Sequence, residues 1–143
     1  MYSTDFGAIT IIAGSTDTML NNNVVTDNDD AAIGLYASLD TTIENNVLVG
    51  NTSGIYFIAG DSGAVINDNC IFDTDTGDGL IISDLLNYTV DATYNFWGAA
   101  EGPGGDGPLG GTLTGSGELI VQKVADNVTV VPYLDECHLP EAE

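Results

Sequence analysis

The chain has almost no positive charge. Its 143 residues contain no arginine, one lysine (Lys123) and one histidine (His138) against 22 acidic residues, so the formal net charge is −21. Proteins bind nucleic acids and anionic lipids largely through basic side chains that displace counterions from phosphates. The composition therefore argues against nucleic acid as a partner, and it leaves metal ions, basic proteins and neutral glycans as the partners that the charge allows.

Long apolar runs and a recognisable leader are also missing. No apolar stretch approaches the roughly 20 residues needed to cross a bilayer, so we expect no membrane insertion. Met1 is followed by Tyr-Ser-Thr-Asp instead of basic and apolar leader regions. The chain begins inside a repeat, which favours a fragment or a mature piece of a larger protein.

Cysteine and histidine are too scarce to predict a transition-metal site, because one histidine and two distant cysteines do not provide a ligand set. The two cysteines, Cys70 and Cys137, allow two readings. A disulfide between them would suit an oxidising compartment, and the alternative is a pair of unrelated free thiols.

What the sequence does contain is a repeat. Hydrophobic residues make up 43% of the chain and Gly, Asn, Asp and Thr dominate the rest, which favours an all-β protein. Asparagine recurs in equivalent positions at Asn23, Asn46, Asn69 and Asn95, with spacings of 23, 23 and 26 residues. A fixed period of this length predicts a solenoid, in which these side chains stack into an asparagine ladder.

A segment with apolar residues at every second position precedes each of these asparagines. Such a pattern predicts a strand with one buried face. We expect Gly34, Gly54 and Gly79 near the starts of coils to need positive φ. Stacking of successive coils should align the inward side chains into four ladders: Ile9, Ile33, Ile55 and Leu80; Ile11, Leu35, Phe57 and Ile82; Leu20, Ile43, Ile66 and Ala92; and Val25, Leu48, Ile71 and Trp97.

Two segments carry a family resemblance. Residues 45–51 read Asn-Asn-Val-Leu-Val-Gly-Asn, and residues 90–98 read Val-Asp-Ala-Thr-Tyr-Asn-Phe-Trp-Gly, followed by Gly-Pro-Gly-Gly at 102–105. They resemble the right-handed parallel β-helix repeats of secreted and cell-surface proteins, with their "DATYNWWG…GP" closing segment. The resemblance implies about four coils over residues 1–98. A Gly-rich loop, a closing strand near 127–134 and an acidic tail would complete the same domain over residues 99–143.

The resemblance is specific for the fold and says little about activity, because the repeat occurs in lyases, hydrolases, adhesins and surface-layer proteins alike. Lyases of this fold are similar in using a Lys or Arg base with bound calcium, and only Lys123 is available here. The aspartates follow turns more than one strand face. We therefore predict no catalytic residues and no enzyme.

The predicted function is a structural or adhesive module that is extracellular or on the cell surface. Because no N-terminal cap is visible, we expect self-association through the coil ends into a filament or envelope layer. The alternatives are a carbohydrate-binding module or a fragment of a polysaccharide-degrading enzyme.

Two sets of candidate ligand-binding residues stand out. The acidic loop 73–79 could bring Asp73, Asp75 and Asp78 onto calcium, the alternative being an ordinary acidic turn. Three aromatic residues are expected to point outward and could stack on a neutral glycan or a protein, unless they are isolated surface residues: Tyr36, Tyr56 and Phe96. Three sequons, which chance could supply in so Asn- and Thr-rich a chain, would permit N-glycosylation: Asn51, Asn87 and Asn127.

Overall fold

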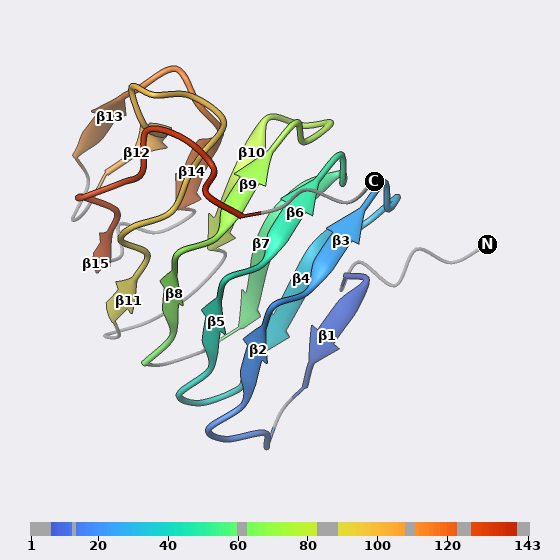
Figure 1. Ribbon diagram of the computed structural model, residues 1–143. Coiled ribbons are helices and arrows are strands. Elements are labelled where there is room, and N and C mark those ends of the chain that lie inside the picture. The colour runs from blue at the N-terminus through green and yellow to red at the C-terminus, as the bar shows by residue number, and fades with distance from the viewer. Residues whose placement is uncertain are drawn as a thin grey trace.

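The computed structural model of the chain describes residues 7–12, 14–59, 63–82, 89–107, 111–122 and 127–139. Its regular elements are all strands, and they stack coil upon coil into a parallel β-helix (Figure 1). The predicted fold is therefore confirmed, with three complete coils and a fourth whose third strand is reduced to a bridge at Phe96.

Each complete coil contributes one strand to each of three sheets. The first coil holds β1 (Ile9–Ile11), β2 (Met19–Asn21) and β3 (Val24–Thr26). The second holds β4 (Ala31–Tyr36), β5 (Thr42–Glu44) and β6 (Val47–Val49). The third holds β7 (Ser53–Ala59), β8 (Val65–Asn67) and β9 (Cys70–Phe72), and the fourth holds β10 (Asp78–Ile82) and β11 (Thr89–Asp91).

The chain then leaves the coils for a hairpin and returns. The hairpin consists of β12 (Gly104–Asp106) and β13 (Thr112–Thr114), which pair antiparallel. β14 (Leu119–Gln122) pairs with β10 in the first sheet, and β15 (Asn127–Thr129) pairs with β11 in the second. Leu134 bridges to Phe96 in line with the third sheet. Because β12 pairs with the outer side of β14, the hairpin covers the C-terminal edge of the first sheet.

The inward side chains follow the predicted register. Ile33 lies between Ile9 and Ile55, and Leu80 pairs with Ile55 on the other side. The other three ladders continue in the same way from coil to coil. The core is therefore a stack of buried aliphatic side chains, partly open at Ile9 and Leu20 of the first coil, with Phe57 and Trp97 as its buried aromatic members.

The corners between strands are built on residues with positive φ, a conformation that Asn, Asp and Gly adopt more readily than other residues. The prediction for Gly34, Gly54 and Gly79 is wrong, since none of them is among the residues with positive φ. Gly54 is required by space instead, because a Cβ there would collide with the carbonyl oxygen of Gly79. Most of the positive-φ residues fall into three columns: Asn22, Asn45, Asp68 and Tyr94; Asp27, Gly50, Asp73 and Gly98; and Asp17, Asp40 and Gly63.

Directional hydrogen bonds join the four repeated asparagines. The backbone N–H and Nδ2 of Asn23 both donate to Oδ1 of Asn46, at 2.9 and 3.0 Å. Asn46 donates in the same way to Asn69, and Asn69 to Asn95. Asn28 and Asn51 form a second such pair. Beyond the first coil, each of these amide oxygens therefore accepts two bonds from the coil before it: those of Asn46, Asn51, Asn69 and Asn95.

One corner carboxylate has a shifted pKa. Burial raises the pKa of Asp91, but hydrogen bonds from the Thr93 hydroxyl, the Thr93 backbone N–H and the Asn67 amide outweigh that effect. The pKa of this carboxyl is held below its ordinary value as a result.

Candidate functional site

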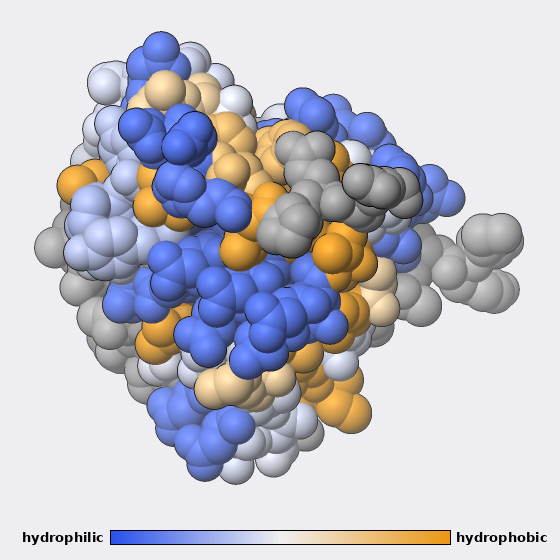
Figure 2. Space-filling view, in the orientation of Figure 1, coloured by the Kyte–Doolittle hydropathy of each residue, from blue (hydrophilic) through white to orange (hydrophobic). Residues whose placement is uncertain are grey.

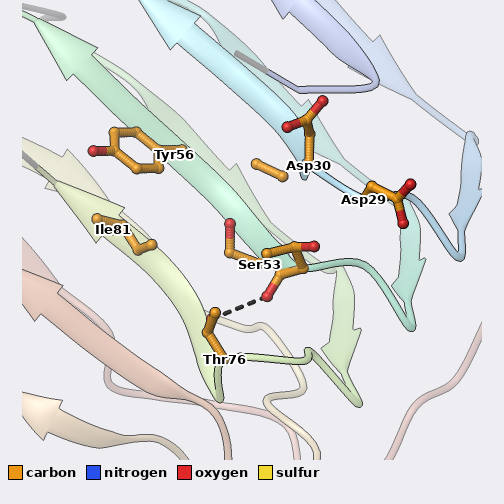
Figure 3. A pocket seen from close by; sticks show the side chains of 8 residues that line it. Asp29, Asp30, Ser53, Tyr56, Thr76 and Ile81 are labelled. Atoms are coloured by element: carbon orange, nitrogen blue, oxygen red, sulfur yellow. Dashed lines mark hydrogen bonds between the residues drawn. The ribbon is translucent and has the colours of Figure 1, made fainter. Parts of the chain in front are cut away.

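A shallow groove of about 380 Å³ lies on the outer face of the first sheet, where three successive coils enter their first strands (Figure 3). One wall is the outward side chains Tyr56 of β7 and Ile81 of β10, which pair with each other across the sheet. On β4 the residue paired with Tyr56 is Gly34, which has no side chain and leaves room beside the ring. The other lining residues come from the turns before these strands and from the first residues of β4 and β7: Asp29, Asp30, Ala31, Thr52, Ser53 and Thr76.

The groove combines an aromatic ring, hydroxyls and carboxylates. The Thr76 hydroxyl donates to the carbonyl oxygen of Thr52 at 2.9 Å, which ties two successive coils together along the floor (Figure 3). Asp29 and Asp30 lie at the end remote from Tyr56 and Ile81. No basic residue lines the groove, so its chemistry suits a neutral, hydroxyl-rich ligand and disfavours an anion.

The structure separates the three aromatic candidates. Tyr56 lines the groove, and Tyr36 lies at the other end of β4, where it pairs with Ala59. Phe96 lies in line with the third sheet, and its ring meets that of Phe72 edge to face at 5.7 Å. The three rings therefore do not form one strip, because the corner between sheets places Phe96 on another face.

The acidic loop predicted to bind calcium joins β9 to β10. Asp73 occupies a corner with positive φ, Asp75 is exposed, and Asp78 begins β10. Glu118 holds the loop by accepting bonds from the Thr74 backbone N–H at 3.0 Å and the Thr74 hydroxyl at 2.6 Å. Among the described residues these three aspartates do not converge as a ligand group, so calcium binding here stays a prediction.

The one group of three potential ligands in the described part of the chain lies in the tail. Ligand atoms of Asp135, Glu136 and His138 all come within 4.8 Å of one another. His138 Nδ1 lies 3.7 Å from Glu136 Oε1, and all three side chains are exposed. Sequence reasoning missed this group because it treated His138 as a lone histidine, although the spacing Asp-Glu-x-His was visible.

The cysteines are joined. A disulfide links Cys70 on β9 to Cys137 in the tail, with Cα atoms 5.5 Å apart, which settles the two alternatives left open by the sequence. The tail up to residue 139 consequently runs back to the third sheet (Figure 1), and Cys70, although on an outward position, is buried.

Of the three sequon asparagines, the structure describes the side chain of Asn51 only. The prediction of a glycan on Asn51 is wrong for the folded chain, because its amide is fully buried and donates to the carbonyl oxygen of Val25 at 2.9 Å. Asn87 lies outside the described residues, as does Lys123, and the Asn127 side chain is likewise not described.

A family model described as "Periplasmic copper-binding protein (NosD)" matches residues 3–90. The chain belongs to the NosD family. Membership in this periplasmic β-helix family supports a location outside the cytoplasm, periplasmic or extracellular. No curated protein and no solved structure matches the chain. Nowhere in the described residues is there a helix with the length and hydrophobicity to span a membrane.

The donor set of the matched residues does not fit copper. Proteins hold copper mainly with imidazole, thiolate and thioether ligands. Residues 3–90 contain no histidine, their one cysteine, Cys70, is in the disulfide, and their one thioether is Met19. The coils of this chain therefore offer oxygen donors only, apart from one exposed methionine.

Proposed function

We propose that the chain is a non-catalytic structural module of an extracellular or cell-surface layer, which associates end to end with further copies of itself. The observation that carries this proposal is the position of the exposed large hydrophobic side chains. Residues 40–93, as far as they are described, contribute none, and every one lies in the first two coils or near the C-terminal end. They are Ile12, Met19, Val24, Tyr36 and Leu39 at the first end, and Tyr94, Leu119, Val131 and Tyr133 at the other.

The N-terminal end also has backbone and amide groups to offer. Within the described residues, β1, β2 and β3 each pair with a strand on one side only, and so form the edges of the three sheets. Oδ1 of Asn23 accepts no bond within the described residues, whereas Oδ1 of Asn46 accepts two. A parallel edge with open acceptors and apolar side chains favours pairing with another chain.

Charge favours this direction of association over side-by-side contact. On the face drawn in Figure 2, hydrophilic surface covers most of the middle coils, and hydrophobic surface lies over the first coil. With a net charge of −21 and one lysine, lateral contact brings like charges together. When the C-terminal end of one copy stacks on the N-terminal end of the next, the pair still has one free N-terminal end and one free C-terminal end. Further copies can therefore add at either end, and the assembly grows along one axis.

The test is the oligomeric state measured by sedimentation velocity over a range of concentrations. Met19→Glu places a charge on the edge strand β2 and should yield a monomer. Thr42→Glu adds the same charge in the same column one coil further in, since Met19 pairs with Thr42, and should associate like the native chain. A native chain that stays monomeric at high concentration in high salt and calcium would refute the proposal, as would equal behaviour of the two variants.

A second candidate function is binding of a neutral glycan in the groove, as a carbohydrate-binding module or as part of a polysaccharide-degrading enzyme. The observation favouring it is the Tyr56 ring beside a row of hydroxyls from Thr52, Ser53 and Thr76. Titration of neutral oligosaccharides followed by NMR should show Tyr56→Ala losing binding while Tyr36→Ala retains it. Hydrolysis of the sugar that stops in Asp30→Asn would favour the enzyme instead.

Calcium remains part of the proposal through the loop at Asp73, Asp75 and Asp78. We expect calcium to raise the melting temperature beyond the effect of sodium chloride at equal ionic strength. Asp75→Asn should remove that excess, and Asp17→Asn, an equal charge change at a distant exposed corner, should not. An unchanged calcium response in Asp75→Asn would eliminate the loop as the site.

A further inference from the structure

Asp135, Glu136 and His138 lie in a part of the tail whose backbone is fixed to the rest of the structure at two points. Just before it, the Leu134 N–H donates to the carbonyl oxygen of Asn95 at 2.9 Å. Within it, Cys137 is covalently joined to Cys70 of β9. The side chains of Asp135, Glu136 and His138 therefore project from a short segment fixed to the third sheet, which lowers the entropy lost on gathering them around a ligand.

The donor types select a class of ion. An imidazole nitrogen with two carboxylates suits first-row divalent metals, among which such sites bind Cu²⁺ most tightly, with Zn²⁺ and Ni²⁺ weaker. Calcium and magnesium are bound by oxygen ligands and gain nothing from an imidazole. This group thus differs in kind from the acidic loop between β9 and β10.

Electrostatics favours a cation at the same place. The carboxylates of Asp135 and Glu136 approach each other in a chain of net charge −21, and the described residues include no lysine or arginine that could pair with them. The two carboxylates repel each other when they lie close together. A divalent cation bound between them makes the electrostatic energy of this arrangement favourable.

We propose that Asp135, Glu136 and His138 form a site for a divalent transition metal, with water completing the coordination shell. The site lies outside residues 3–90, the part that matches the periplasmic copper-binding family, and those residues lack the ligands for copper. Transition-metal binding in this chain accordingly belongs to the disulfide-anchored tail, apart from the calcium proposed at the loop between β9 and β10, and it is independent of end-to-end association.

The experiment uses the full chain without a histidine tag, since His138 is its only imidazole. Calorimetric titration with Cu²⁺ and with Zn²⁺ should give one site per chain, and the Cu²⁺ EPR spectrum should show coupling to one imidazole nitrogen. His138→Asn should weaken binding about tenfold or more and abolish the nitrogen coupling. Asp135→Asn should weaken binding, while Asp17→Asn, with the same change in charge, should not.

The anchor is tested with the double variant Cys70→Ala and Cys137→Ala, which leaves no thiol to compete for copper. Weaker binding at the same stoichiometry is expected, with the imidazole signal retained. Because the three ligand side chains are exposed, their variants should fold with unchanged melting temperatures, so a loss of binding can be read directly. Cu²⁺ binding that is undiminished in His138→Asn, or equally diminished in Asp17→Asn, would overturn the proposal.

Discussion

Replacement of Asn69 by alanine tests whether the stacked amides hold the coils together. Asn69 is fully buried, and its Oδ1 accepts from both the backbone N–H and Nδ2 of Asn46, at 2.9 and 3.0 Å. Its Nδ2 in turn donates to the carbonyl oxygen of Ile43 at 2.9 Å. Alanine removes all of these bonds and leaves the buried N–H of Asn46 without an acceptor.

An orphaned buried donor costs about 1–3 kcal/mol, and each further lost hydrogen bond about 1 kcal/mol, so Asn69→Ala should lower the free energy of unfolding by about 3–5 kcal/mol. Asn23→Ala is the matched control. Asn23 is half-buried at the first coil and its Oδ1 has no partner in the described residues, so about 1 kcal/mol is expected. Urea unfolding followed by circular dichroism measures both. A difference between the two variants of less than about 1 kcal/mol would refute the reasoning.

Three further perturbations test the core, the tail and a corner. Leu35→Asp buries a carboxylate between coils and should cost several kcal/mol in thermal unfolding, while Tyr36→Asp, on the outer face, should cost far less; equal losses would mean a wrong register. Loss of the Cys70–Cys137 disulfide, which spans 67 residues, should lower the free energy of unfolding by about 4 kcal/mol in alanine variants of both cysteines. Because the folded-state pKa of Asp91 is lowered, its contribution is present above the unfolded pKa and is lost as pH falls through the folded value, so Asp91→Asn should flatten the acid limb of melting temperature against pH.

The core was predictable from sequence because the 23-residue period and the period-two strands together specify register. Once Asn23, Asn46 and Asn69 are taken as equivalent, every inward position follows, and the structure pairs Leu20 with Ile43 and Ile43 with Ile66 as expected. A slip of one residue would have turned the aliphatic side chains to solvent, so the pattern permits one alignment only.

Site residues were harder to predict because the repeat assigns the inward positions directly but does not show which turn and outward side chains gather into a groove. The groove needs turn residues from three coils beside Tyr56, and only the coil-to-coil alignment of the outward positions signals it. The return of β14 to the first sheet after the hairpin has no repeat signal either. Glycine is required at position 54 because a side chain there would collide with the neighbouring coil. The sequence does not show this lack of space, and the prediction attributed the glycine to its dihedral angles instead.

The corner column through residues 27, 50, 73 and 98 shows how one position satisfies backbone and charge together. All four residues have positive φ, and Asp and Gly alternate along the axis: Asp27, Gly50, Asp73 and Gly98. A Cβ on Gly50 would lie 2.5 Å from the Asp27 carboxylate oxygen, so glycine leaves the space that this side chain occupies. Alternation also keeps the carboxylates of Asp27 and Asp73 two coils apart, roughly 10 Å at the usual strand spacing, which is about the screening length at physiological salt. In this column glycine therefore separates two carboxylates that a chain with a single lysine has too few cations to neutralise.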